Sequence, residues 1–496
     1  MNDTPDLAPR ALRGLGLPDV LDLLESAARS AAGHLAGIGG GAVWRPVPAA
    51  VREALGSAAL PVSGVSGSAL LGVVEEQVLA YPMGNGHPAF FGWVNAAPHP
   101  AGIAGALLAA AVNPSSAGGD HADVYLERAV VRWIAELVGF PHAPGGGLLT
   151  SGASMATIVA IGAARQRALS RLGWDVRTHG LGEAPRLVAY AGAEVHSCVR
   201  KAVELLGIGS SNLRIVAGDG AGHLDPEALR SAIDADLASG AVPFLVVGSA
   251  GTVTTGAVDP LDALAEVCAQ FGLWFHVDGA YGAFGVLDPV IADRYAGMEL
   301  ADSVALDPHK WLQVPAGVGC LLVRDRAQLR ECYSLVPPYL RDDSGDPIGW
   351  YSEYGIEQTR PFRALPVWAT LVARGRSGVA ADVVACTRAA RLLDELVAKD
   401  SDFSLAAETE VSIVAFRYSP DGMDDAAADR ITRGLARVIQ DRGKVFVTDS
   451  MFEGRPVLRA CLINPLVGEA ELRLLLEEAR AAAFTLTIEV EDLPRR

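Results

Sequence analysis

Short apolar runs alternate with longer amphipathic stretches through the middle of this chain. The short runs predict buried strands, and the stretches in which apolar residues recur every three or four positions predict helices. This alternation predicts a mostly parallel sheet with helices on both faces. Ligands bind beyond the carboxyl ends of such strands, so chemistry is expected in the segments that follow them. The predicted strands are residues 186–190, 213–217, 244–248, 273–277, 303–306 and 319–323, and the predicted helices are residues 130–138, 155–169, 199–206 and 260–271.

The two ends of the chain differ from this middle part. Residues 1–94 contain two helical patches and are predicted to form an N-terminal arm that another surface must cover. Residues 95–375 are predicted to form the large α/β domain, and residues 376–496 a small α+β domain. The polar residues 340–354 indicate a mobile loop. The patches in the arm are residues 17–35 and 70–79; from residue 365 onward we predict helices at 365–396, 424–441 and 469–483 and strands at 411–418, 444–447 and 457–462.

Charge and cysteine content narrow the possible partners. The formal net charge is −17, which argues against a nucleic-acid partner and against attraction to anionic membranes. The longest apolar run, residues 101–112, is too short to span a bilayer, and the first thirty residues lack the pattern of a secretory signal. The six cysteines form no CxxC pair and indicate thiols in a reducing compartment. We therefore expect a cytoplasmic protein.

Lys310 is the first candidate for chemistry, because it follows the predicted strand 303–306. A lysine becomes a usable nucleophile toward an aldehyde when it is partly desolvated, and its neighbours Pro308 and Trp311 are not those of a solvated loop. The alternative is an ordinary lysine that extends from a surface turn.

Asp278 is the second candidate, since it ends an apolar strand and enters a turn of small residues. A carboxylate buried there needs a partner. The protonated ring nitrogen of pyridoxal 5′-phosphate (PLP) would be such a partner, and Ala280 is small enough to let the ring lie nearby. The alternatives are a helix N-cap or a metal ligand. We expect no metal, because no further cluster of carboxylates or histidines follows.

Three more segments follow predicted strands. Residues 149–157 open a helix with small residues, and Ser151, Ala153 and Ser154 are candidate donors to a phosphate, or form only a serine cap. His196 could stack on a flat ring or be a structural histidine. Residues 251–257 offer threonine hydroxyls to a cofactor, or form only a turn.

Taken together, these segments resemble the group II PLP-dependent amino-acid decarboxylases, the family of aromatic-L-amino-acid decarboxylase. The resemblance covers nearly the whole chain. Its most specific parts are residues 276–281 (HVDGAY) and 307–311 (DPHKW), and residues 87–93 (HPAFFGW) add to it. The family fold is the PLP-dependent transferase fold of the aspartate-aminotransferase type. The resemblance implies a homodimer with shared active sites, an amino-acid substrate and removal of its carboxylate as CO₂ to leave the amine.

The resemblance also implies roles for individual residues. Lys310 would carry PLP as a Schiff base, Asp278 would face the ring nitrogen, and His196 would stack on the ring. Tyr351, located by counting back from Arg360, would be a loop tyrosine that returns a proton to the product. The other implied positions are Thr252 or Thr254 beside the ring, Ala153, Ser154, Asp307 and His309 at the phosphate, and Trp93 and Phe91 at the substrate.

Some alternatives stay open. Asp307 replaces an asparagine that is frequent in the aromatic enzymes, and residues 94–96 (VNA) replace a Phe-Pro-Thr pattern. Aromatic substrates are favoured, while glutamate, an aliphatic amino acid, oxidative aldehyde formation and carbon–carbon cleavage remain possible. Outside PLP chemistry, Ser154 with Asp278 and His309 follows the residue order of a serine hydrolase, although the last glycine of its motif is absent. A cofactor-free binding protein is the remaining rival.

Overall fold

The computed structural model describes residues 17–143, 145–335 and 349–491. Its centre is a seven-stranded sheet in the order β1-β7-β6-β5-β4-β2-β3. Strands β3, β2, β4, β5 and β6 pair in parallel, and β7 runs antiparallel to both of its neighbours. The bounds are β1 Gly146–Thr150, β2 Leu187–Gly192, β3 Leu213–Val216, β4 Val242–Ser249, β5 Trp274–Asp278, β6 Ser303–Leu306 and β7 Gly319–Val323.

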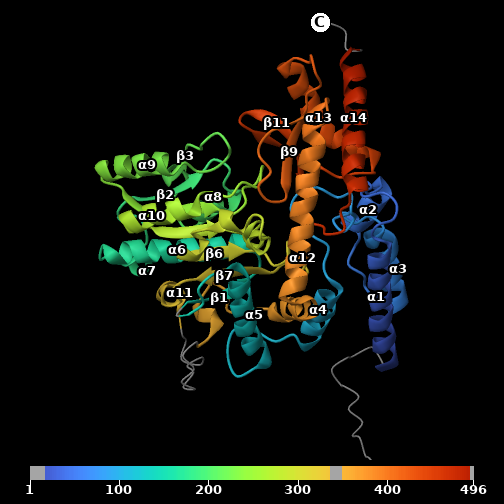
Figure 1. Cartoon of the computed structure of the whole chain (residues 1–496). Coiled ribbons are helices and arrows are strands. Elements are labelled where there is room, and N and C mark those ends of the chain that lie inside the picture. Colours follow the sequence, from blue (N-terminus) through green and yellow to red (C-terminus); the bar gives the residue numbers. More distant parts are fainter. Residues whose placement is uncertain (1–16, 144, 336–348, 492–496) are drawn as a thin grey trace, which may run out of the picture.

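Helices cover both faces of this sheet, as the alternating pattern predicts (Figure 1). One face packs against α6 and α8, and the other against α5, α9 and α10. All five residues of β5 are buried, which explains why its sequence is apolar up to the terminal aspartate. The bounds are α5 Ala122–Val138, α6 Ala153–Arg171, α7 Val176–His179, α8 Ser197–Leu205, α9 Pro226–Ala238, α10 Leu261–Phe271 and α11 Ala327–Tyr333.

A second, antiparallel sheet of order β10-β11-β9-β8 lies in the C-terminal part, with α13 and α14 packed on it. The long helix α12, Ala364–Ala398, runs between the two sheets in Figure 1 and is kinked at Gly375, where φ is 62°. The bounds are β8 Phe403–Leu405, β9 Ile413–Tyr418, α13 Asp425–Arg442, β10 Thr448–Phe452, β11 Arg455–Cys461 and α14 Glu469–Glu491.

The N-terminal helices lie beside α12 and the C-terminal part (Figure 1). They are α1 Leu17–Gly37, α2 Ala49–Ser57, α3 Gly67–Val73, a π-helical turn Val74–Leu79 and α4 Pro100–Val112. Phe90 and Phe91 are buried in the core of the small sheet, so the end of this region is part of the C-terminal packing. Within the described residues, no helix combines the length and the apolar character needed to cross a membrane.

The sequence prediction fails at several elements. It does not predict α2, α7, α9, α11 or β8. The predicted strand at residues 444–447 is wrong, because only Phe446 pairs there, in an isolated bridge with Phe90, and the strand is β10. The rings of Phe446 and Phe90 also stack, 4.9 Å between their centres. Strand β1 was missed, since its first residues are glycines. Helix α4 was missed as a helix because it is apolar on all sides; its buried residues are the glycines that approach α12.

Candidate functional site

A cavity of about 560 Å³ opens at the carboxyl ends of β4, β5 and β6 and is bounded on the other side by β10 and β11. The parallel register places Asp278 beside Ser249 on one side and Ala305 on the other, so the segments that follow these strands converge. Most of the residues predicted from the sequence line this cavity. They are Trp93, Ala153, Ser154, His196, Thr252, Asp278, Ala280, Asp307 and Lys310.

Lys310 lies in the turn after β6 and is held by Asp307. Its Nζ is 3.2 Å from Oδ2 of Asp307, and the two side chains are 18% and 8% exposed. The other carboxylate oxygen of Asp307 accepts a hydrogen bond of 2.7 Å from the amide of Ala153, at the first turn of α6. Asp307 therefore faces the helix N-terminus and the lysine at the same time, which stabilises an acid at a position where the helix dipole favours negative charge.

Asp278 ends β5 and is 7% exposed. One carboxylate oxygen accepts from the amide of Ala280 at 3.1 Å, and the other lies 3.9 Å from the thiol of Cys198. Among the described residues, no cationic side chain forms a hydrogen bond or ion pair with Asp278. A buried carboxylate of this kind is suited to a cationic group that enters the cavity.

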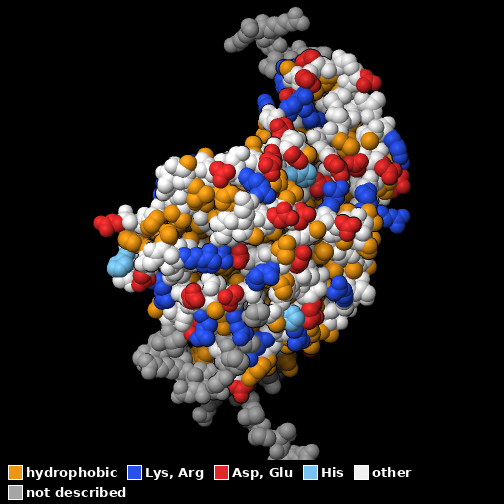
Figure 2. All heavy atoms as spheres, turned by 60° about the vertical axis from the view of Figure 1, so that its left-hand side comes forward, with side chains coloured by type: hydrophobic (Ala, Val, Ile, Leu, Met, Phe, Trp, Pro, Cys, Tyr) orange, Lys and Arg blue, Asp and Glu red, His pale blue; other side chains and the backbone are white. Residues whose placement is uncertain are grey.

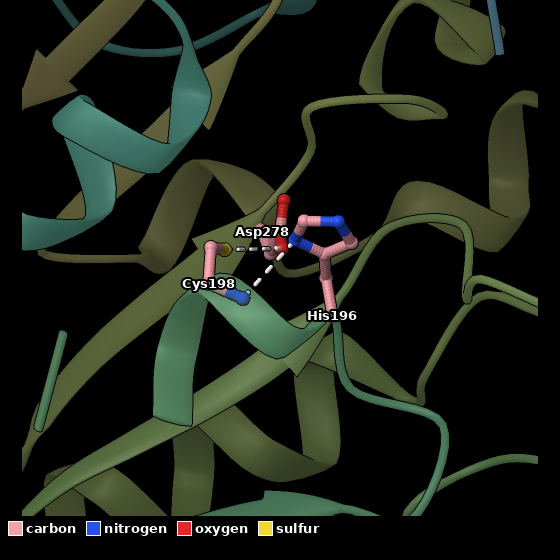
Figure 3. Close-up of side chains that lie close together, drawn as sticks. All are labelled: His196, Cys198 and Asp278. Atoms are coloured by element: carbon pink, nitrogen blue, oxygen red, sulfur yellow. Dashed lines mark hydrogen bonds between the residues drawn. The ribbon is translucent and has the colours of Figure 1, made fainter. Parts of the chain in front are cut away.

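Figure 3 shows how His196 and Cys198 approach Asp278 from the start of α8. Nδ1 of His196 accepts from the amide of Cys198 at 3.2 Å, so the proton of the neutral ring lies on Nε2, which points away from that amide. Burial, and then the nearby Asp278, raise the pKa of the Cys198 thiol to about 12, so the thiol stays protonated and donates. The three residues each place one ligand atom within 4.8 Å of the others, a spacing that a metal ion could also use.

One aromatic side chain, Trp93, and one hydroxyl side chain, Thr252, complete the wall of the cavity. Trp93 is 47% exposed and has a φ of 48°, an unusual conformation for a residue other than glycine. It contacts the ring of Phe446, 5.1 Å between centres, which holds it at the cavity. The hydroxyls of both threonines have side-chain partners, Thr255 for Thr252 and Ser450 for Thr254. Only Thr252 lines the cavity, so the structure favours it of the two predicted threonines.

Three predicted site residues lie elsewhere. Phe91 is fully buried in the core of the small sheet and does not line the cavity. The side chain of His309 is turned to the carbonyl of Val318, 2.8 Å away. Tyr351 is 3% exposed and packs under the guanidinium of Arg360, 4.9 Å from its ring centre. Tyr351 belongs to the core on the α6 face of the large sheet and is not among the side chains that line the cavity with Lys310.

The sequence analysis missed Arg459 and Cys198. Arg459 is 6% exposed, lines the cavity, and donates to the carbonyls of Val253 at 2.5 Å and Trp93 at 2.9 Å. The sequence feature that could have identified Arg459 is a charged residue inside the apolar run of β11. Cys198 had a weaker signal, its position two residues after His196 in the same segment.

The donor set of this cavity fits PLP. Lys310 offers the amine that an aldehyde requires, Asp278 is a buried carboxylate without a recorded cation, and the space above the small side chain of Ala280 is open. The amide of Ala153 is already bonded by Asp307, so in the first turn of α6 Ser154 is the better candidate for a phosphate.

Comparisons with known proteins agree with this chemistry. The model of the pyridoxal-dependent decarboxylase conserved domain matches residues 57–419. Aromatic-L-amino-acid decarboxylase of Bacillus atrophaeus is 29% identical over 86% of this chain and 88% of its own length, and an acidic amino acid decarboxylase of Mus musculus is 31% identical over 88% and 80%. The structure of Oryza sativa TDC with PLP and tryptamine superposes with a TM-score of 0.89 at 27% identity, over 96% of this chain and 99% of that one.

Proposed function

Because this chain belongs to the pyridoxal-dependent decarboxylase family, we propose that the cavity beyond β5 and β6 is its active site. The protein is a PLP-dependent carboxy-lyase that acts on an amino acid. PLP, when bound, supplies an aldehyde that bonds to amines and a protonated ring that accepts the electrons released when the carboxylate leaves. The observation that carries the proposal is that a buried carboxylate, Asp278, and a lysine share one cavity.

Lys310 would hold the cofactor through Nζ. Its ion pair with Asp307 keeps Nζ beside the N-terminus of α6 and restricts the freedom of a long side chain. Asp278 would face the ring nitrogen, where its charge favours the protonated ring. Ser154 would contact the phosphate, with Ala153, Asp307 and His309 behind it, and Thr252 and Ala280 would border the ring.

His196 would hold a proton at Nε2 over the cavity. The amide of Cys198 occupies Nδ1, which keeps the hydrogen of the neutral ring on the side away from the backbone. A neutral ring in this tautomer can donate a hydrogen bond from Nε2 over the cavity. To give that proton to the carbon that CO₂ has left, the ring would first have to take up a proton at Nδ1. Tyr351 does not line this cavity, so it would return a proton only after its segment moved.

We propose an aromatic amino acid as the first candidate substrate. Trp93 presents the largest exposed apolar surface in the cavity and is held by Phe446. A flat ring would gain area and edge or stacking contacts there.

Arg459 favours a second candidate, an acidic amino acid. Its buried guanidinium lines the cavity and has two carbonyl partners, with no carboxylate recorded among the described residues. If it held the carboxylate that departs, it would stabilise the substrate more than the neutral product CO₂ and would slow the reaction. A side-chain carboxylate is therefore the better ligand for Arg459.

A panel of amino acids tests both candidates. Product mass, CO₂ and peroxide would be measured for aromatic, acidic and aliphatic substrates, with Arg459→Met beside the unchanged protein. A selective loss of activity on acidic substrates supports the second candidate, and an equal loss on all substrates refutes it. Peroxide with aldehyde would support the oxidative alternative, and amine alone would support simple decarboxylation.

We also propose that the protein is a cytoplasmic homodimer. Exposed apolar side chains gather on α1, α3 and α4, where a second copy would cover them, and the six cysteines are free. We also propose no nucleic-acid partner, since basic side chains on the face in Figure 2 are interspersed with acidic ones. We further propose that the domain boundaries lie near residues 94 and 375. Light scattering of the purified protein tests the dimer.

A further inference from the structure

Gln313 lies in the turn that carries Lys310 and has a backbone conformation that a glutamine rarely adopts. Its φ is 55°, in the left-handed region that glycine occupies without strain. Among other residues, asparagine, aspartate and histidine are enriched there, and glutamine is not one of them. Such a conformation persists only where the surrounding contacts hold it. The contacts of Gln313 therefore show what this turn depends on.

The main chain of Gln313 closes the turn. The amide of Lys310 donates to the carbonyl of Asp307 at 3.0 Å, and the amide of Gln313 donates to the carbonyl of Lys310 at 3.1 Å. The carbonyl of Gln313 accepts from the amide of His99 at 2.7 Å, directly before α4. The lysine thus lies between two hydrogen bonds of one short turn, and the last residue of that turn is attached to the start of α4.

The side chain of Gln313 attaches the same turn to α12. Its Nε2 donates to Oδ2 of Asp382 at 2.8 Å. Gln313 is partly buried and the side chain of Asp382 is 17% exposed, so the bond is partly shielded from water. A hydrogen bond to a carboxylate is stronger than one between neutral groups. This bond gives a physical reason for a glutamine where glycine would fit the backbone better.

Asp382 is itself held by an ion pair across the kink of α12. Arg374 directly precedes the kink at Gly375, pairs with Oδ2 of Asp382, and donates to the carbonyl of Gly378 at 2.9 Å. The side chains of Arg374 and Asp382 are 23% and 17% exposed. Helix α4 packs against the same helix (Figure 1). Both attachments of the lysine turn therefore end on one pair of packed helices.

We propose that Gln313 and Asp382 are positioning residues for Lys310, because their hydrogen bond holds the lysine turn against α12 and keeps Nζ at the cavity. Asp307 fixes Nζ from the side of α6. Neither Gln313 nor Asp382 lines the cavity, so both act through the turn. This inference rests on the proposed role of Lys310 in holding PLP. Without the bond the turn would occupy other conformations, and the affinity for PLP would fall with the fraction of molecules in the competent one.

An exchange of the two polar groups provides the first test. Gln313→Glu keeps the length of the side chain but places a second carboxylate against Asp382. PLP affinity, measured from the absorbance of the imine, should fall about tenfold, the factor for the loss of one hydrogen bond to a charged group. Adding Asp382→Asn to Gln313→Glu restores a donor and an acceptor in reversed order and should recover most of the affinity. A double variant that binds PLP no better than Gln313→Glu alone would overturn the proposal.

Glycine at residue 313 separates positioning from stability. Gln313→Gly removes the side-chain bond but relieves the backbone, so PLP affinity should fall about tenfold while the melting temperature of the cofactor-free protein changes little. Glu453→Gly is the matched control, because it makes the same backbone change at an exposed residue with a φ of 49°, in the turn between β10 and β11 and outside the cavity lining. Glu453→Gly should leave PLP affinity unchanged. Equal PLP affinities for the two glycine variants would refute the positioning role, and so would a large fall in melting temperature for Gln313→Gly alone.

Lys310→Ala distinguishes a failure of this inference from a failure of the proposed function. If Lys310→Ala still formed the imine with unchanged affinity, the proposed role of Lys310 would fail, and the positioning role with it. If Lys310→Ala abolished the imine while Gln313→Glu bound PLP normally, only the inference about Gln313 and Asp382 would fail. We expect Lys310→Ala to abolish the imine and Gln313→Glu to weaken it.

Discussion

Asp278→Asn should affect the cofactor-free and cofactor-bound proteins in opposite directions. The substitution keeps the size of the side chain and removes its charge. In the cofactor-free protein the carboxylate is 7% exposed, and its recorded partners are one amide and one thiol. Burial of an ion costs several kcal/mol, and two hydrogen bonds offset only part of this. We expect Asp278→Asn to stabilise the cofactor-free protein by about 1 kcal/mol, a rise of roughly 1–2 °C in melting temperature.

With PLP, the same substitution should lower both the activity and the stabilisation that the cofactor provides. The protonated ring of PLP would then lose its anionic partner, and removal of one preorganised charge typically lowers kcat by about 10²–10³-fold. The rise in melting temperature on addition of PLP should shrink, because that rise follows the ratio of free PLP to its Kd and corresponds to about 2.7 kcal/mol at a hundredfold excess.

Thermal unfolding with and without PLP, together with initial rates, measures both effects. Asp449→Asn is the matched control, because it makes the same change at an exposed carboxylate that lines the same cavity. It should leave the melting temperature of the cofactor-free protein unchanged. A large fall in that temperature for Asp278→Asn would mean that the carboxylate holds the fold together, and the reasoning from an uncompensated charge would be wrong.

Three other variants test separate parts of the structure. Glu127→Gln removes the nearer carboxylate from the buried guanidinium of Arg360, both side chains being 1% exposed, and leaves Glu357 at 4.0 Å. It should destabilise the protein by about 3–5 kcal/mol in denaturant unfolding, against at most about 0.5 kcal/mol for the exposed Glu469→Gln. With Tyr351→Phe, the product identified by mass should still be the amine. A shift to aldehyde and peroxide would show that Tyr351 takes part in proton return. Tyr339→Phe, at a position outside the described residues, is the comparison. The hydrogen bond with Glu410 raises the pKa of His223 to about 9, so this pair stabilises the fold fully below pH 6.5 and loses that effect as the pH rises toward 9. His223→Gln should remove this pH dependence from the melting temperature, and an unchanged dependence would refute the assignment.

The inner strands of the large sheet could be predicted from the sequence because β2, β4, β5, β6 and β7 are buried along most or all of their length. Such strands are continuous apolar runs, and each end is marked by a polar residue or a glycine. Asp278 and Lys310 follow directly from this rule, since the residue after a parallel strand lies at the edge of the sheet where ligands bind. The strands β6 and β7 begin and end where the pattern predicts.

The substrate side of the cavity could not be predicted in the same way. Phe91 and Trp93 are two residues apart and would share a face if the segment were extended. The left-handed backbone at Trp93 turns that side chain to the cavity while Phe91 enters the core. Tyr351 was located by its distance from Arg360 along the chain, which gives no side-chain direction, and the buried cation of Arg360 holds the ring inside the protein.

Arg459 illustrates a second limit. An arginine in an apolar strand is visible in the sequence, but its partners are carbonyls of two distant loops. Only the packing of the small sheet against the large one brings them together.

The most direct test of the account is the site of covalent attachment. The protein would be loaded with PLP, reduced with borohydride, digested, and its peptides mapped by mass. We predict one pyridoxyl group on the peptide that contains Lys310. A pyridoxyl group on Lys201, Lys399 or Lys444 instead, or none on any peptide, would contradict the assignment of the active site.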